Sequence, residues 1–221
     1  MPHAADNRTL KHGCIVMASG VGARFGGNKL MAELCDVPLV GHVVRATDDL
    51  FSRRVVVTRH ADVAALCETL GVQVILHDEP CRNDTVRLGM EAMDGCDTVT
   101  FVQGDQPLIR PASIVALLRA AERDAAGAVR RDAAESSVAR IWRTSFDGVP
   151  GAPVLFPSWA FDELRSLPRG KGGGFVAKTH AECVRTIEVS SEWELFDVDT
   201  RDDLEQLQTH VARCGSAGLP R

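Results

Sequence analysis

The run CIVM (14–17) and the segment directly after it, ASGVGARFGGNKL (18–30), decide how this chain folds. CIVM is a short apolar run of residues that favour β-strands. The segment that follows brings four glycines and two cations: Gly20, Gly22, Arg24, Gly26, Gly27 and Lys29. A glycine-rich loop after a buried strand exposes backbone N–H groups, which together form a concave anion site. The stretch therefore predicts a phosphate-binding loop at the end of the first strand.

Two familiar phosphate motifs fit the spacing of this loop but not its residues. A dinucleotide fingerprint requires a third glycine where Phe25 stands, and a Walker loop requires lysine where Asn28 stands. The chemistry of the loop is still coherent, because Arg24 can fork onto phosphate oxygens. Lys29 offers a compact charge to an α-phosphate or to leaving pyrophosphate. A glycine-rich hairpin with two solvated cations is the alternative that the spacing leaves open.

The rest of the chain alternates strand-like and helix-like segments, which favours a mostly parallel sheet with helices on both faces. We predict strands at 14–17, 54–58, 72–76, 98–102 and 184–189, and helices at 38–50, 62–71, 84–93, 111–124, 157–167 and 200–214. Asp84 is the expected N-cap of the third helix. Residues 125–150 are mixed and polar, with an extra β segment and a substrate-side loop, and 168–174 form a flexible turn. We expect one domain over 13–214 between loose ends at 1–12 and 215–221.

Composition narrows the class of protein. The 221 residues are 45% hydrophobic and carry a formal charge of −5, which argues against a nucleic-acid partner. No apolar run is long enough to span a membrane, and the first residues lack a signal-peptide core, so a cytoplasmic protein is expected. The seven cysteines show no metal or disulfide spacing. Most of them lie in apolar runs and are expected to be buried.

The loop resembles the opening motif of the MobA-like nucleotidyltransferases, which join a cytidylyl or guanylyl group to a phosphorylated acceptor. That motif reads approximately LAAGxSxRFGxxK, and MASGVGARFGGNK (17–29) is similar to it, with Ser19 in place of the second alanine. The resemblance implies a Rossmann-like three-layer α/β/α fold and catalytic roles for Arg24 and Lys29. It also implies that Ala18, Ser19, Gly20 and Gly22 bind the nucleotide.

Two acidic segments are the candidate metal ligands. FVQGDQPLI (101–109) places Asp105 at the end of a predicted strand, where a carboxylate can hold Mg²⁺ between protein and phosphates. Its GDQP resembles the metal-binding segment of the molybdenum-cofactor branch of the family. LFDVDTRDDL (195–204) resembles the closing D-x-D-T-P-E-D-L, so Asp199, and less surely Asp197, is expected to complete the Mg²⁺ shell. A helix N-terminus capped by Thr200 is the structural interpretation, and the two are compatible.

Two further segments bear on the substrates. RNDTVRLGM (82–90) resembles the base-side segment of the isoprenoid-pathway cytidylyltransferases, which implies that Arg82 and Thr85 bind the nucleotide. The alternative is that Asp84 and Thr85 only cap the helix predicted at 84–93 and do not contact a nucleotide. GAPVLFPSWAFDELRSLPRGKGGG (151–174) resembles the acceptor-side segment of the molybdenum-cofactor cytidylyltransferases, but Lys171 replaces an aspartate.

The resemblance is greatest to the molybdenum-cofactor cytidylyltransferases. It implies an Mg²⁺-dependent transfer of a cytidylyl group from CTP to a phosphorylated acceptor, with release of pyrophosphate. Molybdopterin cofactor is the favoured acceptor, and a molybdoenzyme maturation protein is the implied partner. Three alternatives remain open: a 2-C-methyl-D-erythritol 4-phosphate cytidylyltransferase, a guanylyl-transferring homologue, and a nucleotide-binding regulatory module without catalysis.

Overall fold

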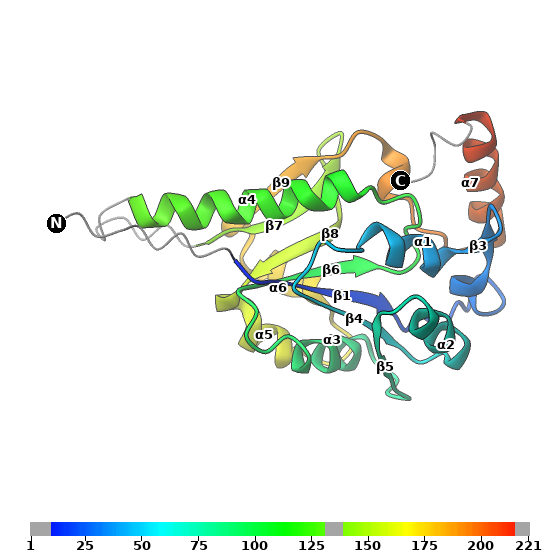
Figure 1. The fold of residues 1–221 in the computed structure, drawn as a ribbon, viewed down its shortest axis with the longest axis horizontal. Helices are drawn as coiled ribbons and strands as arrows, with labels where there is room; N and C mark the ends of the chain where they lie inside the picture. The colour runs from blue at the N-terminus through cyan, green and yellow to red at the C-terminus, as the bar shows by residue number, and fades with distance from the viewer. Residues whose placement is uncertain (1–9, 131–138, 215–221) are drawn as a thin grey trace.

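A single twisted sheet forms the middle layer of the molecule (Figure 1). The computed structural model of the chain describes residues 10–130 and 139–214, with the side chains of 128–130 left out. Within these residues the sheet has seven strands in the order β5-β4-β1-β6-β8-β7-β9. Their bounds are β1 His12–Ala18, β4 Arg53–Thr58, β5 Gln73–Leu76, β6 Thr98–Gln103, β7 Ile141–Phe146, β8 Val149–Pro157 and β9 Val184–Glu188. Only β8 runs antiparallel to its neighbours, which confirms a mostly parallel sheet.

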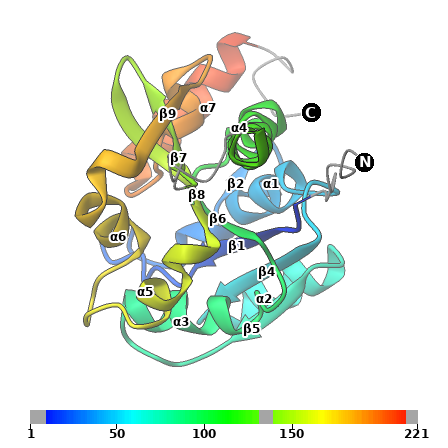
Figure 2. The same cartoon turned by 90° about the vertical axis from the view of Figure 1, so that its left-hand side faces the viewer.

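Helices cover both faces of the sheet, as predicted. Figure 2 shows α1 and α4 on one side and α3 and α5 on the other. α2 packs into the core beside α1, and α6 packs into the core beside α5. The helix bounds are α1 Leu39–Ala46, α2 Ala61–Thr69, α3 Arg82–Glu91, α4 Pro111–Arg130, α5 Phe161–Arg165, α6 Gly173–Thr179 and α7 Arg201–Cys214. Short 3₁₀ turns lie at Lys29–Met31, Ser158–Ala160, Ala181–Cys183 and Glu192–Leu195, and a small hairpin pairs β2 Glu33–Leu34 with β3 Val37–Pro38.

The apolar run of β1 explains why both faces are covered. Successive side chains of a strand point to opposite faces of the sheet. Ile15 accordingly packs with α3 and α5, while Cys14 and Val16 pack with α1 and α2, and all three side chains are fully buried. A strand that is apolar on both faces is stable only at the centre of such a layered structure.

Several predicted boundaries were wrong. The helix expected at 111–124 continues to Arg130. Residues 131–138, from the segment expected to be mixed and polar, lie outside the described residues. The β7–β8 hairpin begins after them, at Ile141. The helix expected at 157–167 is shorter, and the glycine-rich turn opens a helix, α6, that the sequence did not predict. Asp84 is not the N-cap of α3. Cys81 takes that position, and the Asp84 carboxylate accepts a hydrogen bond from its backbone N–H at 3.3 Å.

The expectation of mostly buried cysteines was also wrong. Cys14 and Cys67 are buried, whereas the other five are exposed or partly exposed. Cys35 lies in the β2–β3 turn with a positive φ of 50°, and Cys214 is the last residue of α7. Cys35 and Cys214 are exposed because a turn and a helix end place them at the surface, although their side chains are apolar.

The two ends of the chain are described only in part. Residues 1–9 of the expected N-terminal segment and the whole tail at 215–221 lie outside the described residues. β1 begins at His12, which is buried. Among the described helices none combines the length and the hydropathy needed to cross a membrane.

The carboxyl ends of β1 and β6 bring the predicted loop and Asp105 to the same edge of the sheet. These strands are paired in parallel over their whole length, and the Gly104 N–H donates to the Met17 carbonyl at 3.0 Å. A side chain at Gly104 would lie 3.1 Å from that carbonyl oxygen, so glycine permits the close approach. In open α/β sheets, ligands bind beyond the carboxyl ends of the strands.

Candidate active site

The glycine loop is a tight turn whose shape depends on Gly22. This residue has a φ of +62°, and its carbonyl accepts hydrogen bonds from the N–H groups of Phe25 and Gly26 at 2.9 and 3.1 Å. A Cβ at Gly22 would lie 2.1 Å from the Gly27 carbonyl oxygen. Gly22 therefore closes the loop, and its predicted contact with nucleotide stays a prediction.

Phe25 anchors the loop where a dinucleotide site would have its third glycine. Its ring is buried against Leu34 and Leu39, in a cluster that also contains residues of α7. The guanidinium of Arg201, which stands where the resembled family has proline, lies 4.9 Å from the ring centroid. Packing of Phe25 thus ties the loop to the start of α7.

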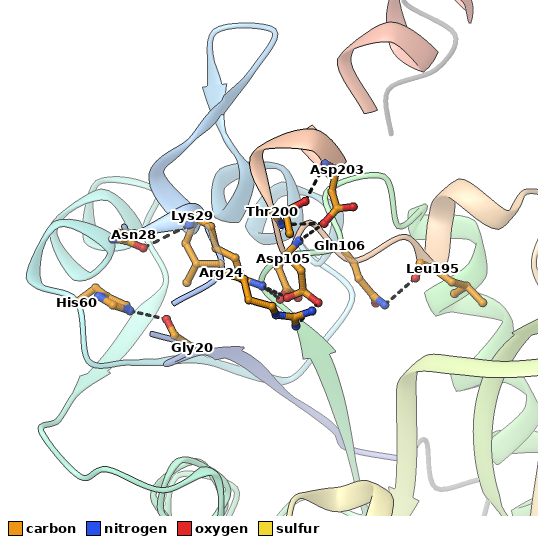
Figure 3. Close-up of polar contacts among 12 residues, drawn as sticks. Gly20, Arg24, Asn28, Lys29, His60, Asp105, Gln106, Leu195, Thr200 and Asp203 are labelled. Carbon is orange, nitrogen blue, oxygen red and sulfur yellow. Dashed lines mark hydrogen bonds and ion pairs between the residues drawn. The ribbon is translucent and has the colours of Figure 1, made fainter. Parts of the chain in front are cut away.

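Four of the predicted residues meet in one cluster beyond the end of β6 (Figure 3). The ammonium of Lys29 lies 2.7 Å from Asp105 Oδ2 and 2.8 Å from Asp199 Oδ1. The guanidinium of Arg24 lies 2.6 Å from Asp199 Oδ2. Lys29 is 8% exposed, whereas Arg24 is 71% exposed. The structure therefore brings the two predicted catalytic cations and the two predicted metal ligands together, with Lys29 contacting both carboxylates and Arg24 contacting Asp199.

The charges of the cluster stabilise one another. Burial works to lower the pKa of Lys29, but the carboxylates of Asp105 and Asp199 outweigh it and raise that pKa above its usual value. The hydrogen bond from Lys29 is the main reason why the pKa of Asp199 is lowered. Lys29 is accordingly a protonated ammonium, and Asp199 is an ionised carboxylate.

The backbone around α7 holds Asp199 beside Asp105. The Val198 N–H donates to the Asp105 carbonyl at 3.0 Å, and the Val198 side chain is buried in the cluster with Phe25. The Asp203 carboxylate accepts from the N–H groups of Asp199 and Thr200, and the Thr200 hydroxyl accepts from the Asp203 N–H. The predicted cap at Thr200 is confirmed, and it coexists with the placement of Asp199 in the cluster.

Asp197 lies in the same cleft, although part of its surface faces solvent. Loss of solvent around the carboxyl, together with the charges of Asp105 and Asp199, raises the pKa of Asp197 to about 6. A third carboxyl group therefore adjoins the pair that Lys29 bridges.

Two cavities meet at this cluster. The smaller, of about 220 Å³, lies over the loop and α3; the larger, of about 710 Å³, lies between the loop and the β7–β8 hairpin. Both are lined by Arg82, Gln103 and Asp105. A group bound in one cavity is thus adjacent to a group bound in the other, with Asp105 at the junction.

The predicted nucleotide-binding residues divide into two sets. Ser19, Gly20, Arg82 and Thr85 line the smaller cavity, but Ala18 and Gly22 do not. Ala18 is fully buried in the core beneath the loop.

Ser19 and Arg82 differ in how they are held. The Ser19 hydroxyl donates to the Val57 carbonyl at 3.0 Å and lies 2.8 Å from His77 Nε2, so it is held against the neighbouring strand ends. The side chain of Arg82 forms no hydrogen bond or ion pair with the described residues, and it lines both cavities.

Sequence reasoning missed several residues that line the cavities. Arg59 and Glu79 follow β4 and β5 in the smaller cavity, and the rule that ligands bind beyond strand ends, applied to those strands, identifies both positions. Gln106 and Arg143 line the larger cavity. No motif marks Arg143, because it comes from the hairpin in the irregular second half.

The pair of carboxylates fits a divalent cation that is shared with phosphate. Asp105 and Asp199 both direct an oxygen at the single nitrogen of Lys29. Mg²⁺ is commonly held by one or two carboxylates together with substrate phosphates rather than by a complete protein cage. The part of the chain that the structure describes contains no group of three or more His, Cys, Asp or Glu residues arranged to hold a metal. The donor set therefore suits a cation that arrives with a nucleotide.

Comparison with known proteins identifies the family. The profile of the MobA-like NTP transferase domain matches residues 14–184, which include most of β1, the glycine loop, β6 and Asp105. The chain belongs to this family, as its opening motif and its sheet indicated.

Named relatives and solved structures agree with this assignment. The chain is 33% identical over 122 residues to the 3-deoxy-manno-octulosonate cytidylyltransferase of Anaeromyxobacter sp. (strain Fw109-5), covering 51% of this chain and 48% of that protein. It is 36% identical over 121 residues to the enzyme of the same name from Alkalilimnicola ehrlichii, covering 50% and 45%. These matches span about half the length of the curated relatives.

Solved structures of low identity share the fold. An Rv0371c homologue from Mycobacterium sp. strain JC1 superposes with a TM-score of 0.74 at 23% identity, covering 92% of this chain and 98% of that one. Rv0371c of Mycobacterium tuberculosis H37Rv in complex with manganese gives 0.70 at 19%, covering 91% and 99%. Molybdopterin-guanine dinucleotide biosynthesis protein A from Archaeoglobus fulgidus gives 0.64 at 19%, also covering 91% and 99%. The predicted three-layer nucleotidyltransferase fold is confirmed.

Proposed function

We propose that the chain transfers a cytidylyl group from CTP to a phosphorylated small-molecule acceptor and releases pyrophosphate. The observation that carries this proposal is the junction of the two cavities at Asp105, beside Lys29 and Arg24. A donor nucleotide in the smaller cavity and an acceptor in the larger one would place the reacting groups at that junction. Transfer between two bound substrates is then a matter of position and charge neutralisation.

The reaction is a single in-line displacement. An oxygen of the acceptor phosphate attacks the α-phosphorus of CTP, a new P–O bond forms, and the bond from the α-phosphorus to the β-phosphate oxygen breaks. The electron pair of that bond leaves with pyrophosphate. A phosphate nucleophile is already ionised at neutral pH, so the enzyme has no need of a general base or a covalent intermediate.

Each residue of the cluster has a role in this reaction. Lys29 moves from the carboxylates to the α-phosphate, and the exposed Arg24 forks onto the triphosphate. Asp105 and Asp199 would hold Mg²⁺, which when bound neutralises charge on the phosphate oxygens. Ser19, Gly20, Arg82 and Thr85 would position the nucleotide.

CTP is the preferred donor because the two curated relatives compared above are cytidylyltransferases by name. Molybdopterin cofactor is the first acceptor to test, because the acceptor-side segment at 151–174 resembles that branch of the family. A molybdoenzyme maturation partner would then receive the product. The names of the relatives favour a second candidate, a sugar acid of the 3-deoxy-manno-octulosonate type. Such an acceptor carries a carboxylate in place of the phosphate and would attack through a hydroxyl, whose proton would pass to a carboxylate of the cleft as the P–O bond forms.

The proposal is tested first by thermal shift with CTP, GTP, UTP and ATP, each with and without Mg²⁺. Ligand at about 100 times its Kd adds about 2.7 kcal/mol of stability, which is a readily measured shift for a domain of this size. A shift confined to CTP with Mg²⁺ supports the cytidylyl assignment, and a preference for GTP moves it to guanylyl transfer.

Pyrophosphate release with molybdopterin, or with 3-deoxy-manno-octulosonate, then tests transfer. Lys29→Ala is expected to lower turnover by about 10²–10³-fold, as for loss of one preorganised donor. Arg87→Gln, which alters a surface ion pair on α3, serves as the control. Near-normal turnover in Lys29→Ala would refute the role of Lys29. Nucleotide binding without pyrophosphate release from any phosphorylated acceptor would favour a regulatory module instead.

A further inference from the structure

Arg143 is a half-buried cation in the wall of the larger cavity, with no carboxylate partner among the described residues. It lies in the middle of β7 and lines the cavity together with Asp105 and Asp197. None of the described residues forms an ion pair with it. Burial lowers its pKa, and no neighbouring carboxylate offsets that effect. A guanidinium withdrawn from water is costly unless an anion or several acceptors compensate it.

Within the described residues, a β-bulge supplies the acceptor that the Arg143 guanidinium contacts. β7 and β8 pair regularly at Arg143 with Val154, but the register then shifts so that Ser145 pairs with Pro150. The intervening residues of β8 bulge out of the ladder, which frees the Gly151 carbonyl. Arg143 Nε and Nη2 donate to this oxygen at 3.1 and 2.9 Å. Bulges of this kind often lie next to active sites, where they redirect a side chain.

Packing on the far side of the bulge holds this arrangement. A Cβ at Gly151 would lie 2.9 Å from Leu195 Cδ1, so glycine allows the bulge to press against that side chain. The Leu195 carbonyl in turn accepts a hydrogen bond from Gln106 Nε2 at 3.1 Å. Gln106 directly follows Asp105 in the turn after β6. The bulge that orients Arg143 is thus connected to the segment that carries Asp105.

The contacts occupy only one edge of the guanidinium. Arginine has five N–H donors in a fixed planar fork. Nε–H and one hydrogen of Nη2 are used on Gly151, which leaves the other Nη2 hydrogen and both Nη1 hydrogens. These donors form the edge that binds carboxylate or phosphate in a bidentate manner.

We propose that Arg143 is the acceptor-side anion subsite of this protein and binds a phosphate or carboxylate of the acceptor through its free edge. The assignment rests on the proposed function only in treating the occupant of the larger cavity as an acceptor. It adds to that function the residue that recognises the oxyanion of the acceptor, and it implies that a neutral sugar or alcohol is a poor ligand. Arg82, the other unpaired cation of the cavity, lies at the junction and is shared with the nucleotide.

The test measures oxyanion binding without nucleotide. Ribose 5-phosphate and 3-deoxy-manno-octulosonate serve as the phosphate and carboxylate probes, and ligand-observed NMR titration gives the Kd of each. Arg143→Gln removes the charge and the fork, whereas Arg143→Lys keeps the charge and removes the fork. Arg165→Gln, at a partly exposed arginine paired with Asp94 and Asp162 outside both cavities, is the matched control. The Tm of each variant reports whether it is folded.

We expect Arg143→Gln to weaken binding of at least one probe by about 10–100-fold, the effect of losing hydrogen bonds to a charged group. Arg143→Lys is expected to recover only part of this loss, and Arg165→Gln to behave as the wild type. Weakening confined to ribose 5-phosphate identifies a phosphate acceptor, and weakening confined to the sugar acid identifies a carboxylate acceptor. Equal affinity in wild type and Arg143→Gln, or no binding of either probe by the wild type, overturns the proposal. Full affinity in Arg143→Lys overturns the bidentate geometry.

The same variants separate this subsite from the proposed transfer reaction. A thermal shift with CTP is expected in Arg143→Gln as in the wild type, because Arg143 does not line the smaller cavity. Arg143-dependent binding of a probe, with no CTP shift and no pyrophosphate release in the wild type, would refute nucleotidyl transfer and retain the subsite.

Discussion

Lys29 occupies the point at which a divalent cation would contact both carboxylates, so replacing it with methionine should raise the affinity for metal. In the wild type an entering cation must break the hydrogen bonds from the ammonium to Asp105 and Asp199. In Lys29→Met those bonds are absent and the two carboxylates face each other. The variant is therefore expected to bind metal before nucleotide, whereas the wild type requires nucleotide to draw Lys29 away.

The size of the effect follows from the geometry. Two like charges about 4 Å apart repel each other by about 4 kcal/mol at an effective dielectric constant of about 20. Asp199 is 34% exposed, so solvent screening reduces this value, and we take about half of it, roughly 2 kcal/mol. A cation that relieves this repulsion should bind about 30-fold more tightly to Lys29→Met than to the wild type.

Titration with Mn²⁺, followed by the electron paramagnetic resonance signal of the free ion, measures this affinity without nucleotide or acceptor. Lys11→Met is the matched control, because it removes one surface cation next to the start of β1, at the opposite end of the strand from the cluster. Adding Asp105→Asn to Lys29→Met should abolish the gain. A Kd for Mn²⁺ in Lys29→Met within about threefold of the wild-type Kd would refute the reasoning, because the bridge would then offer no barrier to metal.

Three further results are expected from the rest of the structure. Gly22→Ala should lower the free energy of unfolding by about 1–3 kcal/mol, because the new Cβ meets the Gly27 carbonyl oxygen at a positive φ; chemical denaturation measures this, and an unchanged midpoint would contradict the loop geometry. Stability should fall as pH drops below about 6.5, because burial lowers the pKa of His42 in the folded state and the unfolded chain then binds the proton more tightly; His42→Asn should flatten the fall in Tm between pH 7 and 5. Arg201→Ala should cost only about 0.5–1 kcal/mol through loss of its contact with the Phe25 ring, and nucleotide shifts should be unchanged; a lost CTP shift would show that Arg201 takes part in binding.

Much of the fold and half of the site could be predicted from local sequence. The apolar run of β1 predicts a central strand because both of its faces need cover, and the structure confirms helices on both faces. The rule that ligands bind beyond strand ends placed the glycine loop and Asp105 at one edge. Element boundaries were less predictable. Neither the end of α4 nor the start of α6 follows from residue preferences, since packing against the sheet decides where those helices stop and begin.

The residues of the site divide in the same way. Arg24, Lys29, Asp105 and Asp199 were predicted from motifs, because the chemistry of phosphate and metal restricts which side chains can serve. Ala18 was placed among the nucleotide-binding residues by its position in a motif, but the structure puts its side chain in the core, where the pleat of β1 directs it.

Local pattern and residue chemistry are enough to predict the layered fold, the loop after the first strand and the kinds of side chain that bind phosphate. Which of those side chains touch depends on how the folded elements pack against one another. Lys29 and Asp199 are 170 residues apart, and they meet because the cluster around Phe25 packs the start of α7 against the loop. Arg143 enters the larger cavity because a bulge in a distant hairpin offers it a carbonyl. No local pattern encodes such contacts, since each depends on how separate elements pack in space.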